Sequence, residues 1–178
     1  ISIVDARGNA ISMTSSVEMG FGSTVMVEGF ILNNQLTDFS LRPSVDGKLV
    51  ANRVEPLKRP RSSMAPMMVF NQDDSLNLVV GSPGGGRIID YVAQTMIGIL
   101  DWGLSPQDAI NLPRVTNRNG ATTLEKNTSA KSLQSELESM GHQVRVRDLN
   151  SGVQAIQVQD DKLIGGADPR REGKVMGQ

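Results

Sequence analysis

The chain has 178 residues, with 18 Lys plus Arg against 19 Asp plus Glu, and its net charge is therefore −1. This length suffices for one domain with a hydrophobic core, and the balanced charge gives no general attraction to nucleic acid or to an anionic membrane. The chain has no cysteine and one histidine, His142, which excludes disulfides and a cysteine nucleophile and argues against a transition-metal site. We therefore expect no metal, no nucleic-acid partner and no membrane partner.

The chain opens with a pattern typical of antiparallel strands. Residues 1–5 and 10–17 are rich in apolar side chains, and the turn-forming sequence Ala6-Arg7-Gly8-Asn9 separates them. This arrangement predicts a hairpin. A third strand is predicted over residues 25–32.

Proline and polar residues then indicate loops. Pro43 and Gly47 favour a loop over residues 36–46. The stretch 51–66 contains Pro56, Pro60 and Pro66, which is too proline-rich for a helix interior and too irregular for a central strand. We predict an ordered loop there that ends at Ser62-Ser63.

The second half of the chain mixes strands and helices. Strands at 67–70 and 76–80 predict a hairpin, and the glycine-rich sequence 81–86 follows it. Apolar residues at helical spacing predict a helix over 87–100. The remaining predictions are a helix over 106–112, a helix over 133–140 with Gly141 at its C-cap, and strands over 143–147, 153–158 and 163–164. Strands early, helices in the middle and strands late favour an α+β fold with largely antiparallel sheets.

The sequence Gly81-Ser82-Pro83-Gly84-Gly85-Gly86 is a candidate binding element. It lies between a predicted strand and a predicted helix, where glycine lets backbone N–H groups approach a ligand and the helix start adds partial positive charge. This geometry suits an anion or an oxyanion. A nucleotide-binding P-loop would need Lys followed by Ser or Thr, whereas Arg87-Ile88 stands there. A plain strand-to-helix turn that uses glycine for positive φ explains the sequence equally well.

Two further polar clusters carry little weight when each is taken alone. Ser62-Ser63, beside Arg59 and Arg61, offers hydroxyls and positive charge to a carboxylate, but ordinary loops have the same composition. The run 33–38 offers amides and a carboxylate to an ammonium group, or equally to turn and cap hydrogen bonds.

The order of the short motifs along the chain carries more information than any single one. They are Asp5-x-x-Gly8-Asn9-Ala10, Thr14-Ser15-Ser16, Phe21-Gly22-Ser23, Leu32-Asn33-Asn34-Gln35-x-x-Asp38-Phe39-Ser40, Lys58-Arg59-Pro60-Arg61-Ser62-Ser63-Met64, Gly81-Ser82-Pro83-Gly84-Gly85, Pro113-Arg114 and Asp168-Pro169-Arg170. This series resembles the small, C-terminal subunit of the γ-glutamyltransferase (γ-glutamyltranspeptidase) family. The match covers essentially all 178 residues, so residues 1–178 are predicted to be the small-subunit region of such an enzyme.

The resemblance implies an N-terminal-nucleophile hydrolase with an αββα sandwich, made as a precursor that cleaves itself into a large and a small subunit. In that family, the threonine freed at the start of the small subunit attacks the γ-glutamyl amide of a donor such as glutathione, and its own α-amine serves as base. No cofactor is implied. The implied location is periplasmic or secreted, and the composition also allows the cytoplasm.

The implied catalytic threonine is not among the 178 residues. The family's start resembles Thr-Thr-His followed by a strand like Ile1–Asp5, so we expect the nucleophile upstream of Ile1. We therefore expect the chain to work only with its large subunit, and we expect the isolated polypeptide to be inactive.

The resemblance also implies roles in catalysis for residues of this chain. Ser16 matches a threonine whose hydroxyl steadies the nucleophile. Gly84 and Gly85 match the glycines whose N–H groups form the oxyanion hole. On this basis we expect Gly85→Pro to lower kcat severely. Gly84→Ala, which keeps the N–H group and adds only a methyl group, should be the gentler change.

The same resemblance implies which residues bind the donor. Ser62 and Ser63 match the pair that holds the donor's α-carboxylate, and Gln35 and Asp38 match residues that bind its α-ammonium. Glu18 stands where many members have asparagine. A carboxylate there either pairs with the same ammonium or changes the preferred donor.

Two other functions stay open. Acylases that remove glutaryl-type side chains from cephalosporins share much of this pattern. Their donors lack the α-amine and would leave Asp38 and Glu18 unpaired, which disfavours that activity. The remaining alternative is a non-catalytic fragment that serves binding or interaction.

Overall fold

The computed structural model describes residues 1–160 and 162–177. The chain forms two compact units: Ile1–Thr14 with Ser63–Gln178 makes the larger one, and Ser15–Ser62 makes the smaller one. The predicted site residues divide between them, with Ser63, Gly84 and Gly85 in the larger unit and Ser16, Glu18, Gln35, Asp38 and Ser62 in the smaller one.

A four-stranded antiparallel sheet forms the centre of the larger unit, in the order β13-β12-β8-β7. Strand β8 (Leu76–Gly81) pairs with β7 (Met67–Phe70) on one side and with β12 (Gln154–Gln159) on the other. Strand β13 (Lys162–Ala167) pairs with β12 and is longer than the two residues predicted. The predicted hairpin and the late strands are confirmed.

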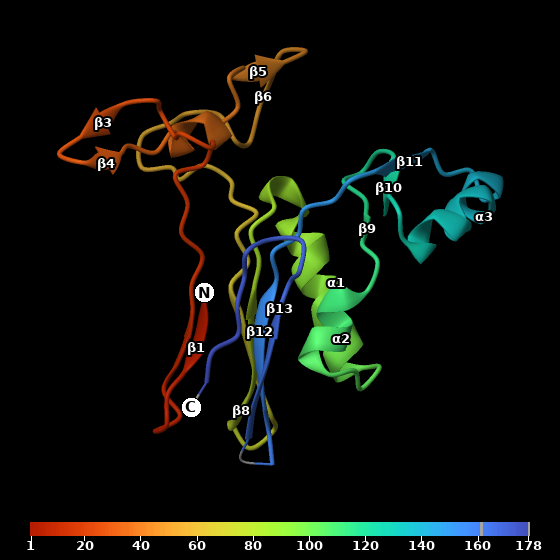
Figure 1. Cartoon of the computed structure of the whole chain (residues 1–178). Helices are drawn as coiled ribbons and strands as arrows, with labels where there is room; N and C mark the ends of the chain where they lie inside the picture. Colours follow the sequence, from red (N-terminus) through yellow and green to blue (C-terminus); the bar gives the residue numbers. More distant parts are fainter. Residues whose placement is uncertain (161, 178) are drawn as a thin grey trace. The chain divides into compact units, whose positions relative to one another are not determined.

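Helices α1 (Ile88–Leu100) and α2 (Pro106–Asn111) cover one face of this sheet (Figure 1). Both match predicted helices, and the Ser105 side chain caps α2 by accepting a hydrogen bond from a backbone N–H. Gly98 lets the helices approach, because a Cβ there would lie 2.9 Å from that of Ala109. The helices and the sheet bury one hydrophobic core, made of Leu78, Val80, Ile88, Tyr91, Val92, Ile99, Ala109, Ile110, Val153 and Ala155.

The opening hairpin lies against the other face of the sheet (Figure 1). Strand β1 (Ser2–Val4) pairs antiparallel with β2 (Ala10–Ser12), as predicted, but β2 ends five residues early because β1 offers no further residues to pair with it. Serine hydroxyls on the inner face of the hairpin donate to carbonyls of β8 and β12. The outer face leaves Ile3 and Ile11 about half exposed.

The larger unit also contains a three-stranded sheet, in the order β11-β10-β9. Strands β9 (Val115–Thr116) and β10 (Thr122–Glu125) were not predicted, since both are short and lack alternating polarity. Strand β11 (Val144–Arg147) pairs with β10 in parallel. Helix α3 (Gln134–Ser139), preceded by the 3₁₀ helix η3 (Ser129–Leu133), supplies the connection that parallel strands need. The sheets are thus antiparallel apart from this pair.

The smaller unit begins with a hairpin where one strand was predicted. Strands β3 (Met26–Val27) and β4 (Phe30–Ile31) pair across a two-residue turn, so the prediction of a single strand over 25–32 is wrong. Glu28 has φ of 49° and Gly29 has φ of 84°, the left-handed pair that a tight hairpin requires. The turn is hard to recognise because a glutamate rarely adopts positive φ.

The rest of the smaller unit is also more ordered than predicted. The expected loop over 36–46 includes most of the 3₁₀ helix η1 (Gln35–Asp38) and one strand of a second hairpin, β5 (Ser44–Val45) with β6 (Lys48–Leu49). Phe39 is the one apolar side chain of residues 15–62, all of them described, that is more than nine-tenths buried. Turns and hydrogen bonds, more than a core, therefore define this unit.

Candidate active site

The glycine turn joins the end of β8 to the start of α1. Its backbone has φ of 140° at Gly84 and 59° at Gly85, and the 3₁₀ helix η2 (Gly85–Arg87) then leads into α1. Within the described residues, the N–H groups of Gly84 and Gly85 donate to no protein acceptor. Two free donors next to a helix start, where the helix dipole adds positive charge, are suited to an oxyanion.

Gly84 and Gly85 differ in the space that a side chain at each position would enter. A Cβ on Gly84 would lie 2.6 Å from Cε2 of Tyr91, which is too close, and φ of 140° disfavours every other residue. A Cβ on Gly85 would meet no atom within 4 Å. Gly84→Ala would therefore do more than add a methyl group, and Gly85→Ala is the better control for Gly85→Pro.

The Tyr91 ring that contacts Gly84 lies against a buried arginine. The guanidinium carbon of Arg114 is 5.8 Å from the ring centroid, a distance typical of a cation–π interaction. Arg114 is fully buried and also donates to Oγ of Ser151 at 3.2 Å and to the carbonyl of Ile110 at 3.0 Å. These contacts fix the ring on which the glycine turn packs.

Arg114 belongs to a buried network of charges. Arg170 donates to Glu125 through Nε at 2.5 Å and through Nη2 at 2.8 Å, and to Asp168 through Nη1 at 3.1 Å. Asp168 lies 3.6 Å from Nη2 of Arg114 and accepts a hydrogen bond from Ser151 at 2.5 Å. Two arginines thus face two carboxylates, and each buried charge has a partner.

The ionisation of Asp168 depends on this network. Burial alone would raise the pKa of Asp168, but the hydrogen bond from Ser151, the backbone N–H of Arg170 and the charge of Arg170 outweigh burial and lower it. The carboxylate is therefore ionised at neutral pH and the network remains paired. The motifs that contain Arg114, Asp168 and Arg170 contributed to the resemblance, but sequence analysis assigned them no role.

In the smaller unit, the three residues expected to bind an ammonium group lie together. The side-chain nitrogen of Gln35 donates to Oδ2 of Asp38 at 3.0 Å and to Oε2 of Glu18 at 3.3 Å. Glu18 has φ of 75°, an unusual backbone for a glutamate. Within the described residues neither carboxylate forms an ion pair. Two carboxylates that share one neutral donor retain the capacity to bind a cation.

Two other residues of the smaller unit position this cluster. Oγ of Ser16 accepts a hydrogen bond from the N–H of Glu18 at 2.8 Å and so fixes the backbone at that residue. Asn52 donates to the carbonyl of Asp38 at 2.7 Å and accepts from the N–H of Arg61 at 3.0 Å. Asn52 thereby joins the carboxylate cluster to the loop that contains Ser62. Sequence analysis did not select it, because a lone loop asparagine carries no distinguishing signal.

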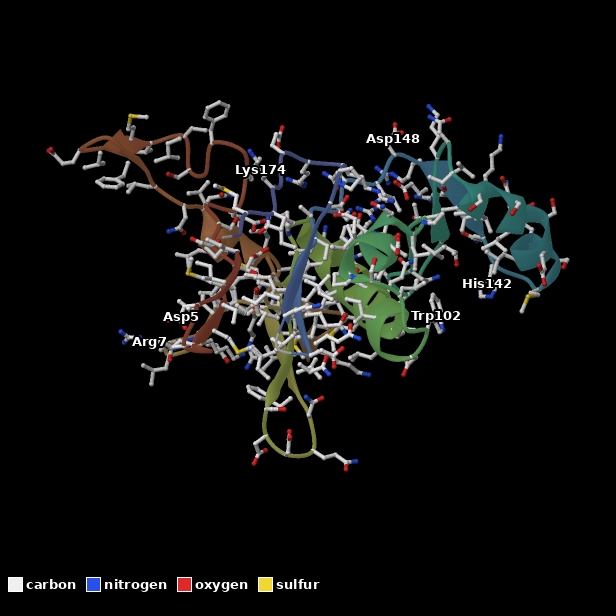
Figure 2. All side chains as sticks on the ribbon, turned by 60° about the horizontal axis from the view of Figure 1, so that its bottom comes forward. Asp5, Arg7, Trp102, His142, Asp148 and Lys174 are labelled. Carbon is white, nitrogen blue, oxygen red and sulfur yellow. The ribbon has the colours of Figure 1, made fainter. Side chains whose placement is uncertain are left out.

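The described residues were also compared with the requirements of a membrane-spanning helix and of a metal site. No helix there is long and apolar enough to cross a membrane. Across the same residues, no three His, Cys, Asp or Glu side chains are grouped as metal ligands would be. His142 is exposed beside α3 and takes no part in the glycine turn (Figure 2).

Similar solved structures define the class of protein. The γ-glutamyltranspeptidase of Pseudomonas nitroreducens is 34% identical, with a TM-score of 0.86, over 99% of this chain and 97% of that chain. A cephalosporin acylase from Bacillus halodurans is 30% identical, with a TM-score of 0.86, over 98% of this chain and 33% of that chain. The predicted α+β fold of the N-terminal-nucleophile hydrolases is therefore confirmed.

Sequence comparison narrows the class to a family. The family model described as Gamma-glutamyltranspeptidase matches residues 1–178, and the chain belongs to this family. The glutathione hydrolase proenzyme of Escherichia coli strain K12 is 39% identical over 95% of this chain. The chain spans 30% of the length of that relative.

Proposed function

We propose that this chain is the small-subunit part of an enzyme that transfers the γ-glutamyl group of a glutathione-like donor to water or to an acceptor amine. Membership of the γ-glutamyltranspeptidase family supports this reaction, as does the similarity to a glutathione hydrolase proenzyme. In this proposal the partner is the large subunit cut from the same precursor.

The proposed reaction proceeds through an ester of a threonine that precedes Ile1. The threonine hydroxyl attacks the γ-glutamyl carbonyl, its proton passes to the threonine α-amine, and that amine then protonates the departing amine of the donor. Water or an acceptor amine attacks the ester and frees the threonine. The N–H groups of Gly84 and Gly85 stabilise the negative charge on the carbonyl oxygen in both steps, and Ser16 steadies the threonine hydroxyl.

The cluster of Glu18, Gln35 and Asp38 in the smaller unit is the observation that favours a γ-glutamyl donor. A γ-glutamyl donor has an α-ammonium group, which Asp38 and Glu18 would bind as an ion pair while Gln35 orients both carboxylates. A glutaryl donor has no such group and would leave two carboxylates without a counter-charge. The hydroxyls of Ser62 and Ser63 are assigned to the donor's α-carboxylate.

Replacing Asp38 with alanine in the complete enzyme should raise KM for a γ-glutamyl donor about ten- to hundredfold, because a hydrogen bond between charged groups contributes about 1.5–3 kcal/mol. The value of kcat should change little, since Asp38 is assigned to the ammonium and not to the reacting carbonyl. Steady-state kinetics with a chromogenic γ-glutamyl amide measure both quantities. Asp148→Ala is the matched control, because Asp148 is exposed and has no hydrogen-bond or ion-pair partner among the described residues.

The Asp38→Ala variant also distinguishes the proposed function from the main alternative, a cephalosporin-type acylase. The structural similarity to the Bacillus halodurans enzyme is the observation that favours this alternative. With a glutaryl amide as donor, Asp38→Ala should leave KM unchanged or lower it. A variant that is impaired toward the glutaryl donor and normal toward the γ-glutamyl donor would assign the site to an acylase. A complete protein without activity on either donor would indicate a binding role.

A polypeptide of residues 1–178 alone should not turn over γ-glutamyl amides. Its hydroxyls lack an adjacent amine base, and the most relevant one, that of Ser16, already accepts a hydrogen bond from a backbone N–H. Release of chromophore from a γ-glutamyl amide measures the activity, with the complete processed enzyme at equal concentration as the positive control. Turnover above the buffer background would contradict the assignment of the nucleophile.

A further inference from the structure

A cavity in the larger unit has no role in the proposed reaction. It has a volume of about 340 Å³ and lies at the sheet of β9, β10 and β11. No acidic side chain is among its described lining residues. Half of the lining residues are arginines: Arg87, Arg118, Arg145 and Arg147.

The register of the three strands arranges one wall of this cavity. Thr123 of β10 pairs with Thr116 of β9 and with Arg145 of β11, so the three side chains form a row on one face of the sheet. Arg147 lies two residues after Arg145 and therefore on the same face. The row places two hydroxyl groups beside two guanidinium groups.

The two hydroxyls have no protein partner among the described residues. Thr116 is 3% exposed and Thr123 is 6% exposed, yet both line the cavity. Neither hydroxyl is among the described side-chain atoms that are shielded from solvent without a partner, so both are open to the cavity that they line. An oxygen-bearing ligand in the cavity would satisfy both groups.

The four arginine side chains also lack partners. None of them forms an ion pair or a side-chain hydrogen bond with another described residue, and Nε of Arg87 is shielded from solvent without an acceptor. The carboxylate of Asp90 is close enough to interact with Arg118 and Arg87 but pairs with neither. Even with Asp90 counted, four positive charges face one negative charge. Arg114 and Arg170, in the same unit, are by contrast fully paired.

A glycine leaves room for one of the arginines at the cavity. A Cβ on Gly86 would lie 2.4 Å from Cζ of Arg118, so the guanidinium group lies directly against the glycine turn. Any larger residue at position 86 would displace it. Gly86 thus leaves the room that the Arg118 guanidinium group occupies beside the cavity.

We propose that this cavity binds a small oxyanion with a charge of −2 or more, either a phosphate compound or a polycarboxylate. Guanidinium groups bind such oxyanions through paired hydrogen bonds, and the two threonine hydroxyls donate to further ligand oxygens. The proposal is independent of γ-glutamyl chemistry, because the cavity uses none of the residues assigned to that reaction.

Isothermal titration calorimetry on the complete processed protein tests this proposal, with pyrophosphate and citrate as separate probes and acetate as the monovalent comparison. We expect saturable binding of at least one multivalent probe, and the tighter of the two identifies the phosphate or the carboxylate class. The double variant Arg118→Gln/Arg145→Gln should weaken binding about tenfold or more, because it removes two charge-assisted partners. Its melting temperature without ligand should change little, because both side chains are exposed and neither forms an ion pair with another described residue.

Two further variants distinguish a built site from general attraction to positive charge. Thr123→Val keeps the shape and charge of the cavity and should weaken binding severalfold through the lost hydroxyl. Arg7→Gln removes the same charge at the turn of the opening hairpin, on the other side of this unit from Asp148 and the end of β11 (Figure 2), and should leave affinity unchanged. Absence of saturable binding, or equal weakening by Arg7→Gln, would overturn the proposal. So would arginine variants that loosen the attachment of the large subunit and leave anion binding intact.

Discussion

The Gly85→Pro variant of the complete enzyme should lose about a hundredfold or more in kcat. Proline has no N–H group, so one of the two proposed oxyanion donors disappears, and such a loss raises the barrier by about 3 kcal/mol. The fixed φ of proline, about −65°, is also incompatible with the 59° observed at Gly85. Steady-state kinetics with a γ-glutamyl donor measure the effect, and circular dichroism with gel filtration monitors fold and assembly.

Gly85→Ala is the matched control for this experiment. It keeps the N–H group, and its Cβ would enter open space, although positive φ costs an alanine about 1–2 kcal/mol. Gly84→Ala should be more damaging, because its Cβ would press on the Tyr91 ring. A Gly85→Pro enzyme with normal kcat would show that the oxyanion is stabilised elsewhere.

The Asp168→Asn variant should lower the free energy of unfolding by about 3–5 kcal/mol, because it leaves Arg114 buried without its counter-charge. Asp168 is 1% exposed and Arg114 is fully buried, so water cannot replace the lost partner. The melting temperature of the complete enzyme should fall as a result. Differential scanning calorimetry of the complete enzyme measures the change. Asp148→Asn makes the same chemical change at an exposed position and should have little effect.

The difference in melting temperature between the wild-type enzyme and the Asp168→Asn variant should also depend on pH. The pKa of Asp168 is lower in the folded protein than in the unfolded chain, so its contribution is fully present above the unfolded pKa and is lost as pH falls through the folded pKa. The gap in melting temperature between wild type and Asp168→Asn should therefore narrow in acid. A gap that widened as pH fell would contradict an ionised Asp168.

Long periodic segments of the fold were predictable from sequence. Helix α1 combines helical spacing of apolar residues with Gly103 as its stop, and α2 has a serine cap before Pro106, so local physics and tertiary structure agree. The two-residue strands β3, β4 and β9 were not predictable, because such short strands carry no period and the β3–β4 turn needs positive φ at Glu28, which glutamate rarely adopts. The hairpin of β5 and β6 did carry a signal, because its turn is Asp46-Gly47, a typical hairpin pair, but sequence analysis assigned it to a loop.

The candidate site was predictable as a list of residues, through the order of its motifs, but not as a set of contacts. No sequence pattern reveals that Gln35 bridges two carboxylates or that Asn52 joins Asp38 to Arg61. The packing of Tyr91 on Gly84 was equally hidden, and it makes Gly84→Ala a poorer control than expected. These contacts arise from the folded arrangement of turns and loops, and the residues that they join lie from three positions apart, as in Gln35 and Asp38, to 17 apart, as in Gln35 and Glu18.

The scarcity of buried apolar side chains in residues 15–62 has a consequence for how this unit opens. With Phe39 as its one buried apolar side chain, the unit has little hydrophobic area to hold its hydrogen bonds together cooperatively. Its backbone amides should exchange with solvent through local fluctuations, while the amides of β8 and β12 exchange only when the larger unit unfolds. The residues assigned to the donor's ammonium therefore belong to the least cooperative part of the chain, and a bound donor would slow the exchange of the whole unit.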